Sequence, residues 1–158
     1  MKLLVTGSSG FVGSRVVCLA QKRGMHCVCH RGSQPSEGES IANVAHIPLS
    51  AAANWQPVLQ GVDAVVHCAA KVHQMVGSQN VLAHYREVNV DGTLQLARQA
   101  AESGVKRFIF LSSVKVNGEL SQPGHPFTAQ VTDPPKDPMG SVNMRLNKVY
   151  RHCHKRPG

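Results

Sequence analysis

Three glycines spaced three residues apart separate a short apolar segment from a helical one: Gly7, Gly10 and Gly13. The apolar segment Leu3–Thr6 predicts a buried strand. Residues Gly13 to Arg23 predict an amphipathic helix, which Gly24 ends. A strand that passes through a tight glycine turn directly into a helix is the opening of a βαβ unit with parallel strands. This turn constrains the fold more than any other feature of the chain.

The rest of the chain repeats this alternation of strands and helices. Four further apolar segments predict strands: Met25–His30, Val44–Ile47, Ala64–His67 and Phe108–Leu111. Three more helices are predicted, over Asn54–Leu59, over Leu82–Ser103 and from near Gly140 onward. Residues 31–43 and the proline-rich residues 117–138 predict loops. Short apolar strands of this kind fit a sheet covered on both faces, so we predict the α/β class: a doubly wound parallel sheet (Rossmann) in one domain over residues 1–158.

The glycine turn also predicts a ligand. Gly7 allows the tight turn, Gly10 allows the backbone to approach a pyrophosphate, and Gly13 allows the helix to pack close to the sheet. The helix start adds free N–H groups and the positive end of the helix dipole. We therefore predict a dinucleotide site in the turn, formed by Gly7, Ser9, Gly10, Phe11, Val12 and Gly13.

The end of the second predicted strand bears on which dinucleotide binds. NAD-binding proteins usually place an acidic residue there, to hold the ribose 2′-hydroxyl. This chain has Cys29-His30-Arg31-Gly32-Ser33 instead, with no acid. Arg31 and Ser33 suit a 2′-phosphate, although Arg31 is equally compatible with a solvated loop position. Both NAD and NADP stay open, and the residues favour NADP slightly.

Composition excludes several classes of protein. Hydrophobic residues make up 42% and charged residues 16% of the 158 residues, which is typical of a globular chain. No apolar run approaches the roughly 20 residues that span a bilayer, and the first residues lack a signal peptide's apolar stretch. Five cysteines at irregular spacing indicate reduced thiols. We therefore expect a cytoplasmic protein with no membrane association.

Metal and nucleic-acid binding are not predicted either. The stretch His26–His30 contains two cysteines and two histidines, but a strand places the cysteines on one face and the histidines on the other. His152-Cys153-His154 likewise lacks a second pair at zinc-like spacing. The formal net charge is +8, and five of the 17 basic residues come after position 138. No basic patch is interleaved with aromatic residues, so charge alone does not indicate a nucleic-acid partner.

Several stretches resemble the extended short-chain dehydrogenase/reductase superfamily, in its NAD-dependent epimerase/dehydratase group. They are TGSSGFVG, GVDAVVHCAAKVH, VNVDGTLQLARQAAESGVKRFIFLSSVKVNGE and GHPFTAQVTDPPKDP. The resemblance covers residues 1–138 and is closest to bacterial nucleotide-sugar epimerases and 4-ketoreductases of surface-polysaccharide synthesis. It implies a nucleotide-diphosphate sugar as substrate and is compatible with a homodimer. It also implies further cofactor contacts from Ala69, Ala70, Lys71 and Asn89.

In that family a Ser or Thr, a Tyr and a Lys act together on the sugar and the nicotinamide. A phenol with a pKa of about 10 is a poor base at neutral pH unless a neighbouring Lys lowers it. The resemblance gives the hydroxyl role to Ser113, with Ser112 as the alternative. Met139 and Asn143 stand where the Tyr and Lys are expected. A thioether has no proton to exchange and an amide carries no charge, so we predict no activity for the chain as written.

Two compensating one-base shifts in the gene would explain this altered stretch. Read one base earlier, the codons of residues 139–150 allow Tyr-Gly-x-Ser-Lys, the family's catalytic motif. The same shifts would account for the missing acids and the surplus of basic residues. The alternative is an evolved, non-catalytic helix, and the coding DNA distinguishes the two. Relatives are about twice as long, so the resemblance also predicts a truncation before the C-terminal substrate lobe.

Two functions follow from these observations. The first is an NAD(P)-dependent nucleotide-sugar epimerase, dehydratase or 4-ketoreductase, inactive as written. The second is a non-catalytic NAD(P)-binding sensor or partner protein. The glycine turn supports both equally, whereas Ser113 and the motifs around it favour descent from an enzyme.

Overall fold

A computed structural model describes residues 1–32, 43–71, 83, 86–118, 120–121, 123–128, 140–141 and 143–144. The chain divides into two compact units. The first consists of Met1–Ala70 and Asp91–Leu111, and the second of Lys71–Val90 and Ser112–Gly158. The single domain expected over residues 1–158 stays a prediction.

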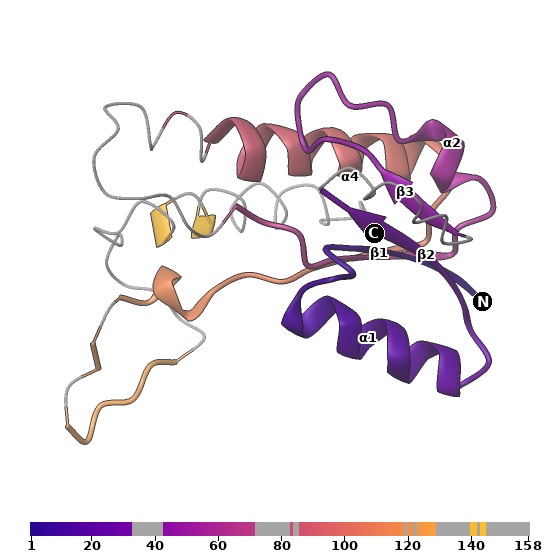
Figure 1. Cartoon of the computed structure of the whole chain (residues 1–158). Coiled ribbons are helices and arrows are strands. Elements are labelled where there is room, and N and C mark those ends of the chain that lie inside the picture. Colours follow the sequence, from indigo (N-terminus) through magenta and orange to yellow (C-terminus); the bar gives the residue numbers. More distant parts are fainter. Residues whose placement is uncertain are drawn as a thin grey trace, which may run out of the picture. The chain divides into compact units, whose positions relative to one another are not determined.

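The first unit contains a five-stranded, entirely parallel sheet with the strand order β3-β2-β1-β4-β5. The strands are β1 (Lys2–Thr6), β2 (His26–Arg31), β3 (Val44–His46), β4 (Ala64–His67) and β5 (Arg107–Phe110). The chain runs outward from β1 to β3, then crosses back to β4 and β5 (Figure 1). This order confirms the doubly wound sheet predicted from the sequence. The strand order reverses between β1 and β4, and ligands of such sheets bind at the carboxyl ends of the strands at this point.

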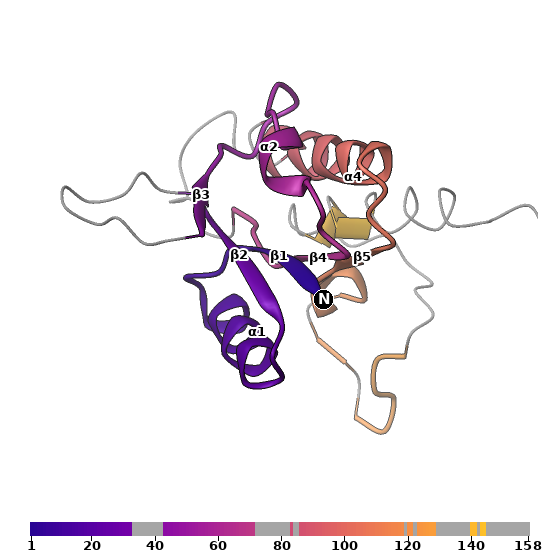
Figure 2. The ribbon, with the colours of Figure 1, turned by 90° about the vertical axis from the view of Figure 1, so that its right-hand side faces the viewer.

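Helices cover both faces of this sheet. Helix α1 (Phe11–Lys22) lies on one face, and α2 (Gln56–Leu59) and α4 (Gly92–Glu102) lie on the other (Figures 1 and 2). Successive residues of a strand point to opposite faces, which separates the core into two clusters. The cluster on the α2 and α4 side contains Leu4, Ala53, Trp55, Leu59, Val62, Val65, Leu96 and Ala100. The cluster on the α1 side contains Leu3, Val5, Ala20, Ala64 and Val66.

The helix predicted over Leu82–Ser103 is helical from Arg86 to Glu102, but it begins with a π-helical turn. Residues Arg86–Asp91 form a π-helical turn, and the α-helical hydrogen bonding of α4 begins only at Gly92. A Cβ at Gly92 would lie 2.9 Å from the carbonyl carbon of Leu49, so the helix packs directly on that backbone. Part of the predicted segment lies outside the described residues.

The second unit has little regular structure among its described residues. A 3₁₀ turn, η2 (Val114–Val116), is followed by a loop in which Asn117 Nδ2 donates to the Thr128 carbonyl at 2.6 Å. Residues 140, 141, 143 and 144 are helical, as predicted for a helix that begins near Gly140. Within the described residues no helix is long and apolar enough to cross a membrane.

Candidate functional site

The glycine turn follows β1 at the switch point of the sheet, and its backbone leaves almost no room for side chains. Gly7 has a φ of +66°, and a Cβ there would lie 2.8 Å from the backbone nitrogen of Ala69. A Cβ at Gly13 would lie 2.1 Å from the Gly7 carbonyl oxygen. Gly10 is less restricted, since its Cβ would be 3.3 Å from the same oxygen. The turn predicted from sequence is therefore confirmed, with Gly13 packed on the turn itself.

The start of α1 presents backbone donors to whatever occupies this turn. The first hydrogen bond into the helix runs from Ser14 N to Gly10 O at 2.9 Å. The N–H groups of Phe11, Val12 and Gly13 precede it, and the cap residue Gly10 makes no side-chain capping bond to them. The first turn of the helix also carries no acidic residue. Uncapped N–H groups and the positive end of the helix dipole suit this position to an anion.

Ser8 and Ser9, adjacent in the turn, differ in their surroundings. Ser9 is exposed, and it is the residue expected among the ligand contacts. Ser8 is 8% exposed, and both its N–H and its hydroxyl donate to the His30 carbonyl oxygen at 3.0 Å. These bonds fasten the turn to the end of β2. Sequence reasoning missed this role, because a serine in a glycine-rich turn carries no signal that separates a tether from a ligand contact.

The segment after β4 faces the turn and rests on buried polar groups. Ala69 donates its N–H to Thr6 Oγ1 at 3.2 Å, while Ala70 is exposed. Thr6 Oγ1 lies 2.6 Å from His67 Nδ1, and His67 Nε2 lies 2.8 Å from Thr93 Oγ1. Burial, with a smaller effect of the His30 charge, lowers the pKa of His67 to about 3. This network was not predicted, since His67 reads in the sequence only as the end of an apolar strand.

Lys71 and Asn89, both in the second unit, are brought together as a backbone clamp. Asn89 Oδ1 accepts the Lys71 N–H at 2.7 Å, and Asn89 Nδ2 donates to the Lys71 carbonyl at 3.0 Å. Asn89 is 4% exposed. Its amide therefore orders the backbone at Lys71, and a direct cofactor contact by either residue stays a prediction.

Arg31 is the last residue of β2 and lies in register with His46 of β3. It is half-buried, at the carboxyl edge of the sheet where the turn also lies. Its position is compatible with a contact to the ribose end of a dinucleotide. Ser33, the second residue considered for a 2′-phosphate, lies outside the described residues.

The residues of the expected catalytic set are described only in part. Ser113 precedes η2, and its Oγ accepts the N–H of Lys115 at 3.2 Å. Asn143 is 9% exposed in a short helical stretch, and Met139 lies outside the described residues. A hydroxyl that accepts one hydrogen bond still has its own proton to donate. The cap is therefore compatible with the predicted role of Ser113 and does not establish it.

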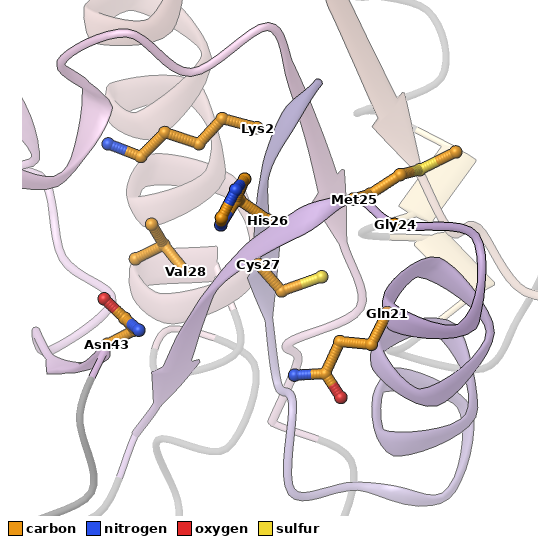
Figure 3. Close-up of a pocket in the computed structure, with 8 residues that line it drawn as sticks. All are labelled: Lys2, Gln21, Gly24, Met25, His26, Cys27, Val28 and Asn43. Atoms are coloured by element: carbon orange, nitrogen blue, oxygen red, sulfur yellow. The ribbon is translucent and has the colours of Figure 1, made fainter.

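A separate pocket of about 490 Å³ lies at the amino end of β2, away from the glycine turn (Figure 3). His26 and Val28 point to one side of the strand and Cys27 to the other, as predicted from strand alternation (Figure 3). Lys2 Nζ donates to the Gln60 carbonyl at 2.7 Å. Burial, and then the neighbouring Cys29, raise the pKa of Cys27.

The described ranges hold no group of three or more His, Cys, Asp or Glu that could bind a metal, and His152–His154 lie outside them.

Comparison with known proteins assigns the chain to a family. The model of the NAD dependent epimerase/dehydratase family matches residues 3–150. The chain belongs to this family. A UDP-glucose 4-epimerase of Vibrio cholerae is 40% identical over 149 residues, which are 92% of this chain and 45% of that protein.

Solved structures agree with the family and its fold. A short-chain dehydrogenase/reductase superfamily protein from Agrobacterium tumefaciens, with bound NAD, is 28% identical with a TM-score of 0.78. It is matched over 100% of this chain and 46% of its own. A UDP-glucuronic acid 4-epimerase from Bacillus cereus, in complex with NAD, is 26% identical with a TM-score of 0.71 over 96% of this chain and 53% of its own. This epimerase/dehydratase chain thus spans about half the length of the relatives it matches.

Proposed function

We propose that the chain binds a nicotinamide dinucleotide at the turn between β1 and α1. The turn offers uncapped N–H groups at the start of α1, beside a backbone wall at Ala69 that a Cβ on Gly7 would strike at 2.8 Å. A surface built of backbone alone allows a pyrophosphate to approach closely. This geometry is the observation that carries the proposal.

When bound, the dinucleotide would supply a hydride acceptor or donor, and the chain's own groups would orient it. The N–H groups of Phe11, Val12 and Gly13 would bind the pyrophosphate. Ser8 would keep the turn against β2 through its two bonds to the His30 carbonyl.

The finer activity that we propose is that of a nucleotide-sugar enzyme of the epimerase, dehydratase or 4-ketoreductase kind, in surface-polysaccharide synthesis. The named relatives from Vibrio cholerae and Bacillus cereus are both sugar-nucleotide 4-epimerases. Ser113 would orient the sugar. Met139 and Asn143 supply neither an exchangeable proton nor a charge, so the chain as written would bind cofactor without turnover. A non-catalytic NAD(P)-binding sensor remains the alternative.

The choice of dinucleotide is the first test. Arg31 and the missing acid favour NADPH, whereas the two solved relatives are described with NAD, which gives that preference no support. Calorimetric titration of the chain with NADH and NADPH should give measurable binding. If Arg31 meets a 2′-phosphate, Arg31→Asp should weaken NADPH binding about tenfold or more and leave NADH binding nearly unchanged.

The outcomes separate the two claims. Absence of binding by either dinucleotide contradicts the proposed function. Binding in which Arg31→Asp affects NADH and NADPH equally contradicts only the preference for NADPH. Gly13→Ala is the control variant that disrupts the glycine turn, and it should abolish binding of both dinucleotides.

A further inference from the structure

A buried chain of hydrogen bonds runs from α4 through β4 and β1 to the segment after β4. Thr93 Oγ1 lies 2.8 Å from His67 Nε2, and His67 Nδ1 lies 2.6 Å from Thr6 Oγ1. Thr6 Oγ1 also accepts the N–H of Ala69 at 3.2 Å. Thr6 is 0% exposed, and His67 and Thr93 are each 1% exposed. Water therefore has no access to replace a bond that is lost here.

The direction of each hydrogen bond in this network follows from the Ala69 N–H, which can only donate. A backbone N–H only donates, so the Thr6 oxygen accepts from Ala69 and its own hydrogen needs an acceptor. In the described part of the chain, His67 Nδ1 lies within hydrogen-bond distance and can take this hydrogen. If Nδ1 accepts this hydrogen, a neutral ring carries its proton on Nε2 and donates it to Thr93 Oγ1. The Thr6 end of the network therefore favours the Nε2–H tautomer of His67.

We propose that His67, held in this tautomer by Thr93, is a positioning residue that fixes the Ala69 N–H and with it the wall of the dinucleotide site opposite Gly7. The inference rests on the proposed function. The wall has no slack, because the Ala69 nitrogen lies only 2.8 Å from where a Cβ of Gly7 would stand. A proton on Nδ1 would leave the Thr6 hydroxyl hydrogen buried without an acceptor, and Thr6 or Ala69 would have to move to relieve it.

The experiment compares three variants of the 158-residue chain. Thr93→Val removes the acceptor of Nε2–H at nearly constant shape, whereas Thr93→Ser keeps it. Ala100→Gly weakens the same helix at a residue that is 2% exposed and outside the network. The readouts are the affinities for NADH and NADPH, the nitrogen NMR signals of the His67 ring, and hydrogen exchange of the Ala69 amide.

We expect Thr93→Val to weaken binding about tenfold, the effect of roughly one net hydrogen bond. The His67 ring should shift toward the Nδ1–H tautomer, and the Ala69 amide should exchange faster. Thr93→Ser and Ala100→Gly should bind as the unaltered chain does.

Two results would overturn the inference. One is an unchanged affinity, tautomer and Ala69 exchange in Thr93→Val. The other is a loss of affinity in Ala100→Gly as large as that in Thr93→Val, which would indicate general destabilisation. If the unaltered chain binds no dinucleotide, the proposed function fails, and the ring signals and amide exchange still decide the positioning role. If Thr93→Val does not fold, an Nδ1–H tautomer in the unaltered chain overturns the inference by itself.

Discussion

Gly13 tolerates no side chain, because a Cβ there would lie 2.1 Å from the carbonyl oxygen of Gly7. A Cβ at Gly10 would lie 3.3 Å from the same oxygen, which is a milder conflict. A Cβ at Gly32 would have no atom within 4 Å. Alanine substitution should therefore lower the free energy of unfolding in the order Gly13, Gly10, Gly32. We expect about 1–3 kcal/mol for Gly13→Ala and no more than about 0.5 kcal/mol for Gly32→Ala. Urea unfolding of the three variants measures this, and equal effects at all three positions would contradict the close packing of the glycine turn.

Ser113 has one observed role, as a cap, and one predicted role, in the reaction. As a cap it accepts the Lys115 N–H at 3.2 Å, which fixes its side-chain rotamer. The hydroxyl keeps its own hydrogen to donate, so this bond does not conflict with the predicted role. The role of Ser113 in the reaction therefore stays a prediction.

At the scale of elements, α4 is fastened to the connection before α2 through one buried amide. Gln99 Oε1 accepts the Trp55 N–H at 2.7 Å, and Gln99 Nε2 donates to the Ala53 carbonyl at 2.8 Å. Gln99→Leu should leave the Trp55 N–H unpaired in the core, while the Ala53 carbonyl still accepts from Gln95 Nε2 at 3.1 Å, and it should destabilise the fold by about 1–3 kcal/mol. Arg98→Ala, an exposed change on the same helix, is the control and should have little effect. A Gln99→Leu variant as stable as its control would show that water or another group replaces the amide.

The strands were predictable from the sequence, whereas the packing between elements was not. Ala64–His67 was predicted with its observed bounds. It is a short apolar run that follows a glycine, Gly61, and its length fits a buried strand. The π-helical turn at the start of the long helix was not predicted, because hydrophobic periodicity does not distinguish it from an α-helix. The contact of Gly92 with the backbone at Leu49 was not predictable either, since it depends on a residue far away in the chain. Gln99 read as an ordinary polar helix residue for the same reason.

The candidate site shows the same division. The glycine spacing identified the turn and its donors, because the reason for each glycine is local. Ser8, Thr6 and Thr93 escaped notice, since their partners lie on other strands and helices. A polar residue in an apolar segment is the signal that could have found His67, yet it does not reveal what the residue bonds.

At the scale of the whole molecule, the buried histidines make stability depend on pH. Burial lowers the pKa of His67 to about 3 and also lowers that of His30, whereas both take up protons near the ordinary pKa of 6.5 when the chain is unfolded. Between pH 3 and pH 6.5 the unfolded state therefore binds more protons than the folded state. The stability that the neutral buried histidines contribute is fully present above pH 6.5 and is lost as the pH falls toward 3. Urea unfolding across this range should show declining stability. His67→Asn should flatten the decline, and the exposed control His26→Asn should not.

The last prediction concerns turnover. A polypeptide of these 158 residues should not convert UDP-linked 4-keto or 4-hydroxy sugars in an assay of nicotinamide absorbance and sugar-nucleotide product. Met139 removes the proton donor expected there, and Asn143 removes the charge that would tune it. Loss of a general acid–base group alone costs about 10²–10⁴-fold in rate.

Restoring those two groups separates the chemistry from the binding of the sugar. Met139→Tyr with Asn143→Lys should still give no turnover in the 158-residue polypeptide, because it matches only 45% of the Vibrio cholerae relative. The same pair placed in a chain extended to the relatives' length should give product, and the extended chain without the pair should not. Dinucleotide binding, measured in parallel, controls for folding, since the glycine turn is unchanged in all four proteins. Clear turnover by the unaltered 158-residue polypeptide would mean that Met139 and Asn143 do not occupy the catalytic positions.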